Sequence, residues 1–132
     1  GIRSEFVRVS EEAGTLVWDG AEYPLVAFRD ERVVDLTVLA RHGYSLAWDG
    51  VARRYTVTAG GSAVDGPAAE SAPEAMPEKG ALMLERGYRA SGPGGAETEL
   101  VSIGGRVFAP LAFLADLGLR VSDEGDVVTV ER

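Results

Sequence analysis

One short stretch of this chain occurs twice with nearly the same pattern. Residues 31–43 have the sequence ERVVDLTVLARHG, and residues 106–118 have the sequence RVFAPLAFLADLG. Shifting the chain by 75 residues aligns residues 6–50 with residues 81–125 without a gap, and ten of the aligned positions are identical. Apolar residues face apolar residues at seven more aligned positions. This pattern predicts that one structural unit is present in two copies, which constrains the fold more than any other feature of the sequence.

Each copy has the same expected order of elements. Short apolar runs predict two strands at the start, FVRV and EYPLVAF in the first copy and ALML and ETELVSI in the second. Gly104 and Gly105 predict a two-residue hairpin turn, because glycine adopts the positive φ angles that such turns need. A third short strand, a helix and a final hairpin of alternating apolar residues follow. The predicted unit is therefore β-β-β-α-β-β.

The predicted helix of each copy has recognisable ends. Asp35 is expected to cap the first helix, because its carboxylate can accept a hydrogen bond from the first-turn amides. Pro110 suits the start of the second helix, where no amide donor is required. Gly43 and Gly118 are expected to end the helices in the left-handed conformation. Apolar positions at i, i+3 and i+4 predict one buried stripe on each helix: Leu36, Leu39 and Ala40, and Leu111, Leu114 and Ala115.

The stretch between the copies has a different composition. Residues 60–80, GGSAVDGPAAESAPEAMPEKG, predict a semi-extended linker with no buried face. The chain is thus divided into a first repeat over 6–59, the linker, and a second repeat over 81–132. A unit of about 50 residues without disulfides or metal has a marginal core, so we expect the copies to pack together or exchange strands. The expected fold class is α+β, with two tandem β-β-β-α-β-β units, antiparallel sheets each wrapped on one short helix, and pseudo-symmetric packing.

Composition and charge exclude several kinds of partner. The 132 residues are 45% hydrophobic and 26% charged, which is typical of a globular protein. The net charge of −8 argues against binding to nucleic acid or to an anionic membrane surface. No apolar run approaches the roughly 18 residues that span a bilayer, so no membrane insertion is expected. Cysteine is absent, which excludes disulfides and thiolate metal sites.

Few residues point to catalysis. His42 is the only histidine, and its place in the last turn of a predicted helix favours a structural role. The sequence contains neither the Gly-x-Ser-x-Gly motif nor the His-Glu-x-x-His motif. No catalytic residue, cofactor or enzyme activity is therefore predicted. Asp123, Glu124 and Asp126 are a weak alternative for a calcium site, but they lack the EF-hand spacing, and their predicted turn favours solvated charge.

The aromatic residues suggest the strongest alternative. Trp18 and Trp48 each precede an Asp-Gly turn, and Tyr55 lies in a neighbouring predicted strand. Exposed aromatic rings of this kind stack on sugars, so these three residues are candidates for a glycan-binding face. The competing interpretation is that each indole covers its own hairpin, and the repeat favours it because it does not preserve the tryptophans as a pair.

The second copy, GGRVFAPLAFLADLGLRVSDEGDVVTVE, and its weaker counterpart, DERVVDLTVLARHGYSLAWDGVARRYTVT, resemble the copper amine oxidase N-terminal-like family, also called stalk domains. The pattern comprises a glycine-rich turn, a strand leading to Pro-Leu, a helix of the form LAxxLG and a closing Trp-Asp. The matching residues are Gly104, Gly105, Val107, Phe108, Pro110, Leu111, Leu114, Ala115, Leu117 and Gly118, with Trp48 and Asp49 in the first copy. The chain departs from the pattern at Ala112 and Thr37, where the family often has arginine, at Asp35 in place of proline, and at Asp123 in place of tryptophan.

The resemblance implies a five-stranded antiparallel sheet wrapped on one helix, separate from any catalytic domain. It also implies an extracellular or cell-envelope location, because similar repeated modules occur in secreted bacterial proteins. We therefore expect a non-catalytic stalk, spacer or protein-interaction module, with a protein or cell-wall glycan as partner. The alternative is a carbohydrate-binding module that uses the Trp/Tyr surface. Strand exchange or a homodimer is a further expectation for so small a repeat unit.

Overall fold

The computed structural model describes residues 3–10 and 12–132. Within these ranges the chain forms mostly strands, with one α-helix and three 3₁₀ helices. In chain order the elements are β1 (Arg3–Val7), β2 (Thr15–Trp18), β3 (Ala21–Pro24), β4 (Val26–Phe28), β5 (Glu31–Asp35), η1 (Leu36–His42), β6 (Tyr44–Asp49), β7 (Arg54–Ala59), η2 (Gly66–Ala68), β8 (Leu82–Ser91), η3 (Pro93–Gly95), β9 (Glu97–Ile103), β10 (Arg106–Pro110), α1 (Leu111–Asp116), β11 (Arg120–Asp123) and β12 (Val127–Glu131).

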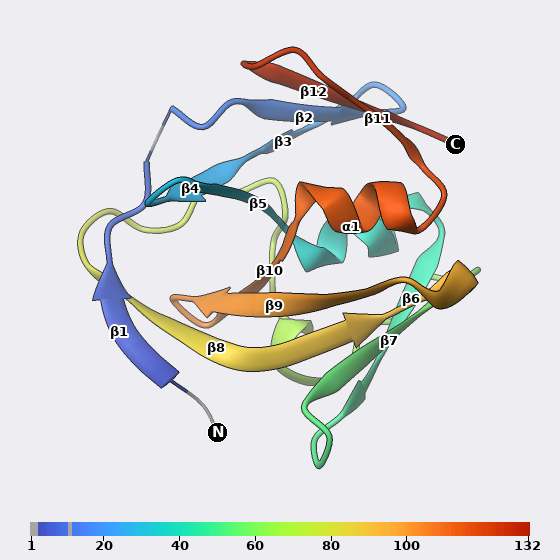
Figure 1. Ribbon diagram of the computed structural model, residues 1–132, viewed down its shortest axis with the longest axis horizontal. Coiled ribbons are helices and arrows are strands. Elements are labelled where there is room, and N and C mark those ends of the chain that lie inside the picture. The colour runs from blue at the N-terminus through green and yellow to red at the C-terminus, as the bar shows by residue number, and fades with distance from the viewer. Residues whose placement is uncertain (1–2, 11) are drawn as a thin grey trace.

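The strands form two sheets. The larger sheet has eight strands in the order β4-β5-β10-β9-β8-β7-β6, with β1 paired to the first part of β8. The smaller sheet has four strands in the order β11-β12-β2-β3. Helices α1 and η1 lie between the two sheets, with the four-stranded sheet above them in the view of Figure 1. The predicted α+β class is therefore confirmed, with strands dominant and helices short.

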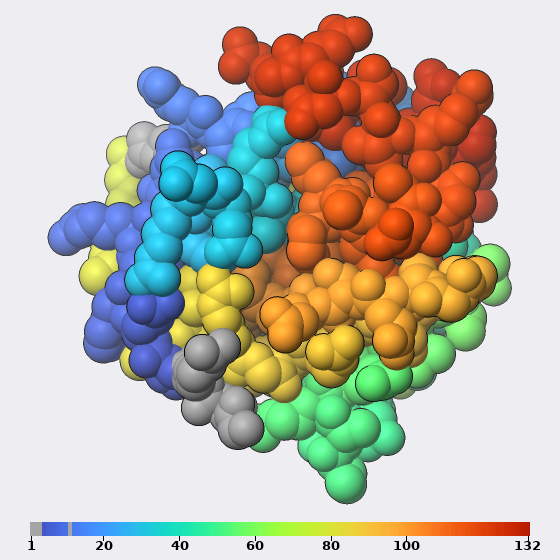
Figure 2. Space-filling model, viewed as in Figure 1, coloured from blue at the N-terminus to red at the C-terminus, as the bar shows by residue number. Residues whose placement is uncertain are grey.

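The expectation of purely antiparallel sheets, one for each repeat, is wrong. Strand β7 pairs in parallel with β8, and β12 pairs in parallel with β2. The hairpin β6–β7, from residues 6–59, thus extends a sheet that contains β8–β10, and the hairpin β11–β12 extends β2–β3. The physical reason is size, because a unit of about 50 residues buries too little apolar surface to be stable without a partner. Figure 2 shows the consequence on one face, where cyan residues of the first repeat abut orange and red residues of the second.

Strands β5 and β10 join the two repeats at the middle of the structure. They run antiparallel, with Val34 opposite Ala109. Val33 lies opposite Pro110 on one side of this pair, and Asp35 lies opposite Phe108 on the other. Val34 therefore pairs with the residue 75 positions further along the chain, and Val33 and Asp35 each pair two positions away from theirs.

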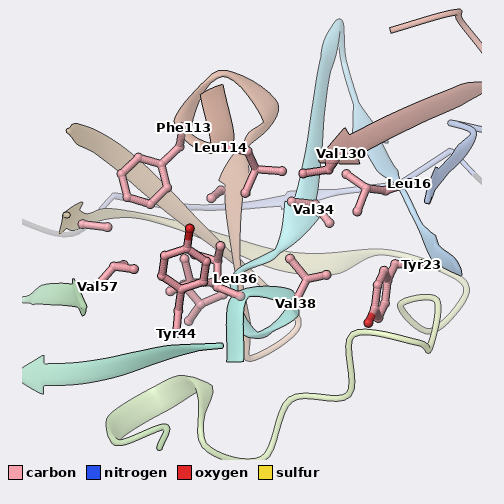
Figure 3. Close-up of a cluster of buried hydrophobic side chains, with 14 of the residues drawn as sticks. Leu16, Tyr23, Val34, Leu36, Val38, Tyr44, Val57, Phe113, Leu114 and Val130 are labelled. Carbon is pink, nitrogen blue, oxygen red and sulfur yellow. The ribbon is translucent and has the colours of Figure 1, made fainter. Parts of the chain in front are cut away.

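A main core fills the space between the sheets and around the helices. It includes Val34, Leu36 and Val38 from the first repeat and Phe113, Leu114 and Val130 from the second. Figure 3 shows these side chains pointing into one shared cluster. Since both repeats contribute to a single core, neither has a complete core of its own.

A second core lies on the opposite face of β5 and β10, under β1 and the start of β8. Its buried members and the two apolar residues packed against them form five pairs whose numbers differ by 75. The pairs are Val7/Leu82, Val9/Leu84, Val26/Val101, Phe28/Ile103 and Val33/Phe108. The residues that recur in the sequence therefore pack against one another in space.

The expected order of elements is found in the second repeat, whereas five strands, β1 to β5, precede the helix in the first. The expected buried stripe of the second helix is wrong at Ala115, which is exposed, because Phe113 and Leu114 face the core.

The predicted caps and turns are confirmed. Asp35 caps η1 by accepting a hydrogen bond of 2.9 Å from the Thr37 amide, and Gly43 ends the helix with φ of 88°. Gly104 and Gly105 form the tight turn between β9 and β10, with φ angles of 59° and 84°. The first helix is a 3₁₀ helix, whereas the second is α-helical. Within the described ranges, no helix is long and apolar enough to cross a membrane.

Candidate functional site

The stretch predicted as a linker is packed against the first repeat. Val64 forms a parallel bridge with Leu46 on the outer edge of β6. The Leu46 amide donates to the Ala63 carbonyl at 2.8 Å, and the Asp65 amide donates to the Leu46 carbonyl at 3.1 Å. The prediction that residues 60–80 have no buried face is wrong, because Ala68 is fully buried. Residues 63–65 thus act as a short additional strand that covers the β6 edge.

Aromatic residues hold this stretch in place. The Tyr55 hydroxyl donates to the Asp65 carbonyl at 2.7 Å and accepts from the Ala68 amide at 2.8 Å. The Trp48 ring packs on Tyr55, with ring centroids 4.8 Å apart. Gly66 lies against the Trp48 ring so closely that a Cβ atom there would be 2.3 Å from ring carbon, and its φ is +68°. Only glycine suits this contact, since both the space and the backbone exclude a side chain.

The predicted glycan-binding face does not form. Trp18 and Tyr55 are both 0% exposed, and a ring with no exposed area cannot stack on a sugar. Trp48 is half-buried, and its ring packs against Tyr55, Tyr88 and Gly66 of the linker. The sequence placed these rings at hairpin ends correctly, but the cover comes from segments far away in the chain. The Trp18 ring is covered by His42 of η1, and Tyr55 lies under residues 65–68.

His42 belongs to a compact cluster with Trp18. The imidazole stacks on the Trp18 ring, with centroids 4.2 Å apart and an interplanar angle of 5°. A hydrogen bond of 2.7 Å joins His42 Nε2 to the Tyr23 hydroxyl, and Asp19 Oδ2 lies 3.6 Å from His42 Nδ1. Burial lowers the pKa of His42, although the nearby Asp19 carboxylate acts in the opposite direction. Burial, together with the negative charge of Glu74, raises the pKa of the Tyr23 hydroxyl. The cluster therefore ties β2–β3 to η1 with a neutral histidine.

Arg106 connects the linker to the sheet, although no motif in the sequence marks this position. Its guanidinium donates to Asp35 Oδ2 at 2.8 Å and 3.0 Å. It also donates to the carbonyls of Ala72 and Ala75. The Asp35 carboxylate, which also caps η1, is almost fully buried, so Arg106 supplies the charge that it needs.

The weak alternative of a calcium site at Asp123, Glu124 and Asp126 is not supported. Asp123 Oδ2 forms an ion pair of 2.5 Å with Arg32, and its Oδ1 accepts from the Gly125 amide. These bonds also lower the pKa of Asp123, the Gly125 amide contributing most. Across residues 3–10 and 12–132, no three side chains of the types that bind metals are grouped to hold an ion. The Asp123 carboxylate instead stabilises the turn itself.

The outer side of β11 and the adjoining face of α1, which we call the β11 edge, are open. Strand β11 ends the order of the four-stranded sheet. Ala112 and Ala115 on α1 are exposed, and Val121 on β11 is partly exposed. In the described part of the chain, no bridge or strand pairs with β11 besides β12. This open strand edge is the candidate functional site, because main-chain groups there are available to a partner.

Comparison with known proteins gives no further assignment. No protein-family model, curated protein sequence or solved structure matches this chain. The function is therefore argued from the chain's own geometry.

Proposed function

We propose that this chain is a non-catalytic spacer and protein-docking module, made of two copies of one unit related by a pseudo-twofold axis. The unit is β-β-β-α-β-β in the second copy and has five strands before the helix in the first. The register of the strands supports the duplication. Val26 lies opposite Val33 in β4–β5, and Val101 lies opposite Phe108 in β9–β10, which is the same register shifted by 75 residues. The axis passes between Val34 and Ala109, where β5 meets β10.

The observation that carries the proposal is the reciprocal pairing of the terminal hairpins. Hairpin β6–β7 of the first copy pairs with β8 of the second, and hairpin β11–β12 of the second pairs with β2 of the first. Each copy thus completes the sheet of the other. A body joined in this way resists separation of its halves, which is the mechanical property that a spacer needs.

The chemistry of the buried polar groups supports a non-catalytic role. His42 is held between Trp18 and Tyr23, and Asp35 is neutralised by Arg106. Catalysis requires such groups to reach a substrate, whereas these bind other parts of the fold. The sequence resemblance to stalk domains supports a place outside the cytoplasm, in a secreted or cell-envelope protein of a bacterium.

Single-molecule pulling on the two ends tests the spacer. One rupture, with a length gain that corresponds to the whole folded chain, is expected because the hairpins interlock the halves. Two separate ruptures, each corresponding to about half of the chain, would contradict the proposal. Surface labelling of a tagged copy in intact cells of the organism that encodes the protein tests the location, and labelling only after lysis would contradict it.

A further inference from the structure

We propose that the β11 edge binds an extended, basic segment of a partner protein, which adds in parallel to β11 as residues 63–65 add to β6. The inference rests on the proposed function and deepens it, since it names the docking surface and the chemistry of the partner. Its basis is a difference between two edges that occupy equivalent places in the duplicated unit.

One of the two equivalent edges is already filled. Strand β6 corresponds to β11 after a shift of 75 residues, so Leu46 corresponds to Val121. Leu46 is 1% exposed because Val64 lies beside it, whereas Val121 is partly exposed. The register of the two hairpins differs by two residues, since Leu46 lies opposite Val57 whereas Val121 lies opposite Val130 rather than Arg132. An offset of two residues keeps the alternation of pairs along the hairpin, and the bond from the Glu124 amide to the Val127 carbonyl makes Val121–Val130 a non-hydrogen-bonded pair. The outward amide and carbonyl that bind the added strand on β6 therefore have equivalents on β11.

The helix beside each edge shows the same difference. Thr37 and Ala40 of η1 line the groove that contains Val64, and Thr37 is only 5% exposed. The equivalent residues of α1, Ala112 and Ala115, are both exposed. Alanine at both positions leaves room for a side chain of the size of valine. The groove that holds Val64 in the first copy therefore indicates the kind of side chain that the equivalent place in the second copy can bind.

The shape of the added strand defines the shape of the partner segment. Val64 is partly buried against the main core and follows Ala63. A Cβ atom at Gly61 would lie 2.6 Å from the Ser45 hydroxyl oxygen, so little space is available there. We therefore expect a β-branched residue preceded by small residues in an extended conformation.

Charge defines the rest of the partner. Arg41 of η1 forms an ion pair of 2.9 Å with Glu74, which lies further along the linker. The equivalent of Arg41 is Asp116 on α1, which is exposed. A segment that follows the same path would place a residue near Asp116, and a basic residue is the complement of that carboxylate. The net charge of −8 also favours a positively charged partner.

The partner is a different protein rather than a second copy of this chain. The segment of this chain that has the required shape, residues 63–65, is already bound to β6. The second copy also lacks the aromatic support of the first, with Asp123 opposite Val128 where Trp48 lies opposite Tyr55. The partner must therefore be held by main-chain hydrogen bonds and by charge.

Amide hydrogen exchange measured by NMR tests the inference. The probes are two synthetic peptides, one with the sequence of residues 60–76 and one that carries Glu74→Arg within it. At saturation, the Arg peptide is expected to slow exchange of the Val121 amide by about tenfold. The native-sequence peptide should bind more weakly, since its glutamate faces Asp116. In a protein with Asp116→Arg this preference should reverse.

A matched pair of variants locates the binding. Ala115→Gln puts a larger neutral side chain on the expected path and should abolish the effect, whereas Ser122→Gln on the exposed face of β11 should preserve it. Equal effects of the two variants would overturn the proposed location. Fusing the Arg peptide after Arg132 raises its effective concentration into the millimolar range, so weak binding is also detected.

The same data separate the two proposals. If the Leu46 amide is protected while neither the free nor the fused peptide slows Val121, the β11 edge is not a docking site, and the spacer remains. If Leu46 exchanges as fast as Val121 in the peptide-free protein, residues 63–65 do not cover β6 in solution, and the inference loses its basis. Pulling experiments would still test the interlocked fold independently.

Discussion

Val34 lies opposite Ala109 at the centre of the structure, and both residues are 1% exposed. They connect β5 and β10, the pair of strands through which the two repeats meet. Side chains at this position contact the core of both repeats at once. Substitutions here should therefore affect the whole molecule rather than one half.

Val34→Ala is expected to destabilise the entire fold. Removing two buried methyl groups at a position that cannot collapse costs about 2 kcal/mol of unfolding free energy. Urea unfolding followed by tryptophan fluorescence and by far-UV circular dichroism measures the effect, and the two curves should shift together. Val51→Ala is the control, because Val51 is 98% exposed. Separate transitions in the two signals would show that the halves unfold independently.

Arg106→Met should be strongly destabilising. The substitution leaves the Asp35 carboxylate buried without its ion pair, which costs about 3–5 kcal/mol. Arg120→Met is a matched control, because the pair of Arg120 with Glu131 is exposed on both sides and should contribute less than about 1 kcal/mol. Thermal unfolding of both variants measures the difference. Similar losses of stability would show that Asp35 finds another partner.

Tyr55→Phe should loosen the linker. The substitution removes the hydroxyl that bridges the Asp65 carbonyl and the Ala68 amide, and a buried polar group without a partner costs about 1–3 kcal/mol. The Ala68 amide should then exchange with solvent much faster, as measured by NMR. Tyr88→Phe is the control, since Tyr88 is only half-buried. Unchanged protection of Ala68 would mean that packing alone holds residues 65–68.

Stability should fall on mild acidification through His42. Burial lowers its folded-state pKa below the unfolded value of 6.5, so the unfolded state binds more protons between these two values. The contribution is fully present above pH 6.5 and is lost as pH falls through the folded-state pKa. Urea unfolding from pH 7.5 to pH 5 measures this loss, and His42→Gln should flatten the dependence. If the His42→Gln protein kept the pH dependence of the original protein, carboxylates rather than His42 would cause the loss of stability.

The features that the sequence predicted correctly are local. The Asp35 cap, the Gly43 helix end and the Gly104-Gly105 turn each depend on residues within one turn of the chain. The apolar positions that recur in the sequence are also buried together, as with Val26 and Val101 and with Val33 and Phe108. These local features were sufficient to locate most of the helices and hairpins along the chain.

The features that the sequence did not predict are contacts between distant segments. Nothing in β12 specifies that it pairs with β2, because the parallel register is set by the packing of both repeats. Trp18 resembled a ligand-binding residue since its ring is covered by His42, which lies outside its hairpin. Tyr55 did so since its cover comes from the linker. The open β11 edge was likewise missed, because an edge is defined by the absence of a neighbour.

The parallel pairing of β2 with β12 has a consequence for biosynthesis. Thr15–Trp18 is synthesised early, whereas its neighbour Val127–Glu131 is translated after nearly all the other strands. Until then Leu16 and Trp18, both fully buried in the finished protein, have no cover on that side. The emerging chain can therefore pair β2 with β3, but the other edge of β2 stays open until β12 has left the ribosome. Premature termination before residue 127 would yield a product with an apolar, aggregation-prone strand, and quality-control proteases would be expected to degrade it.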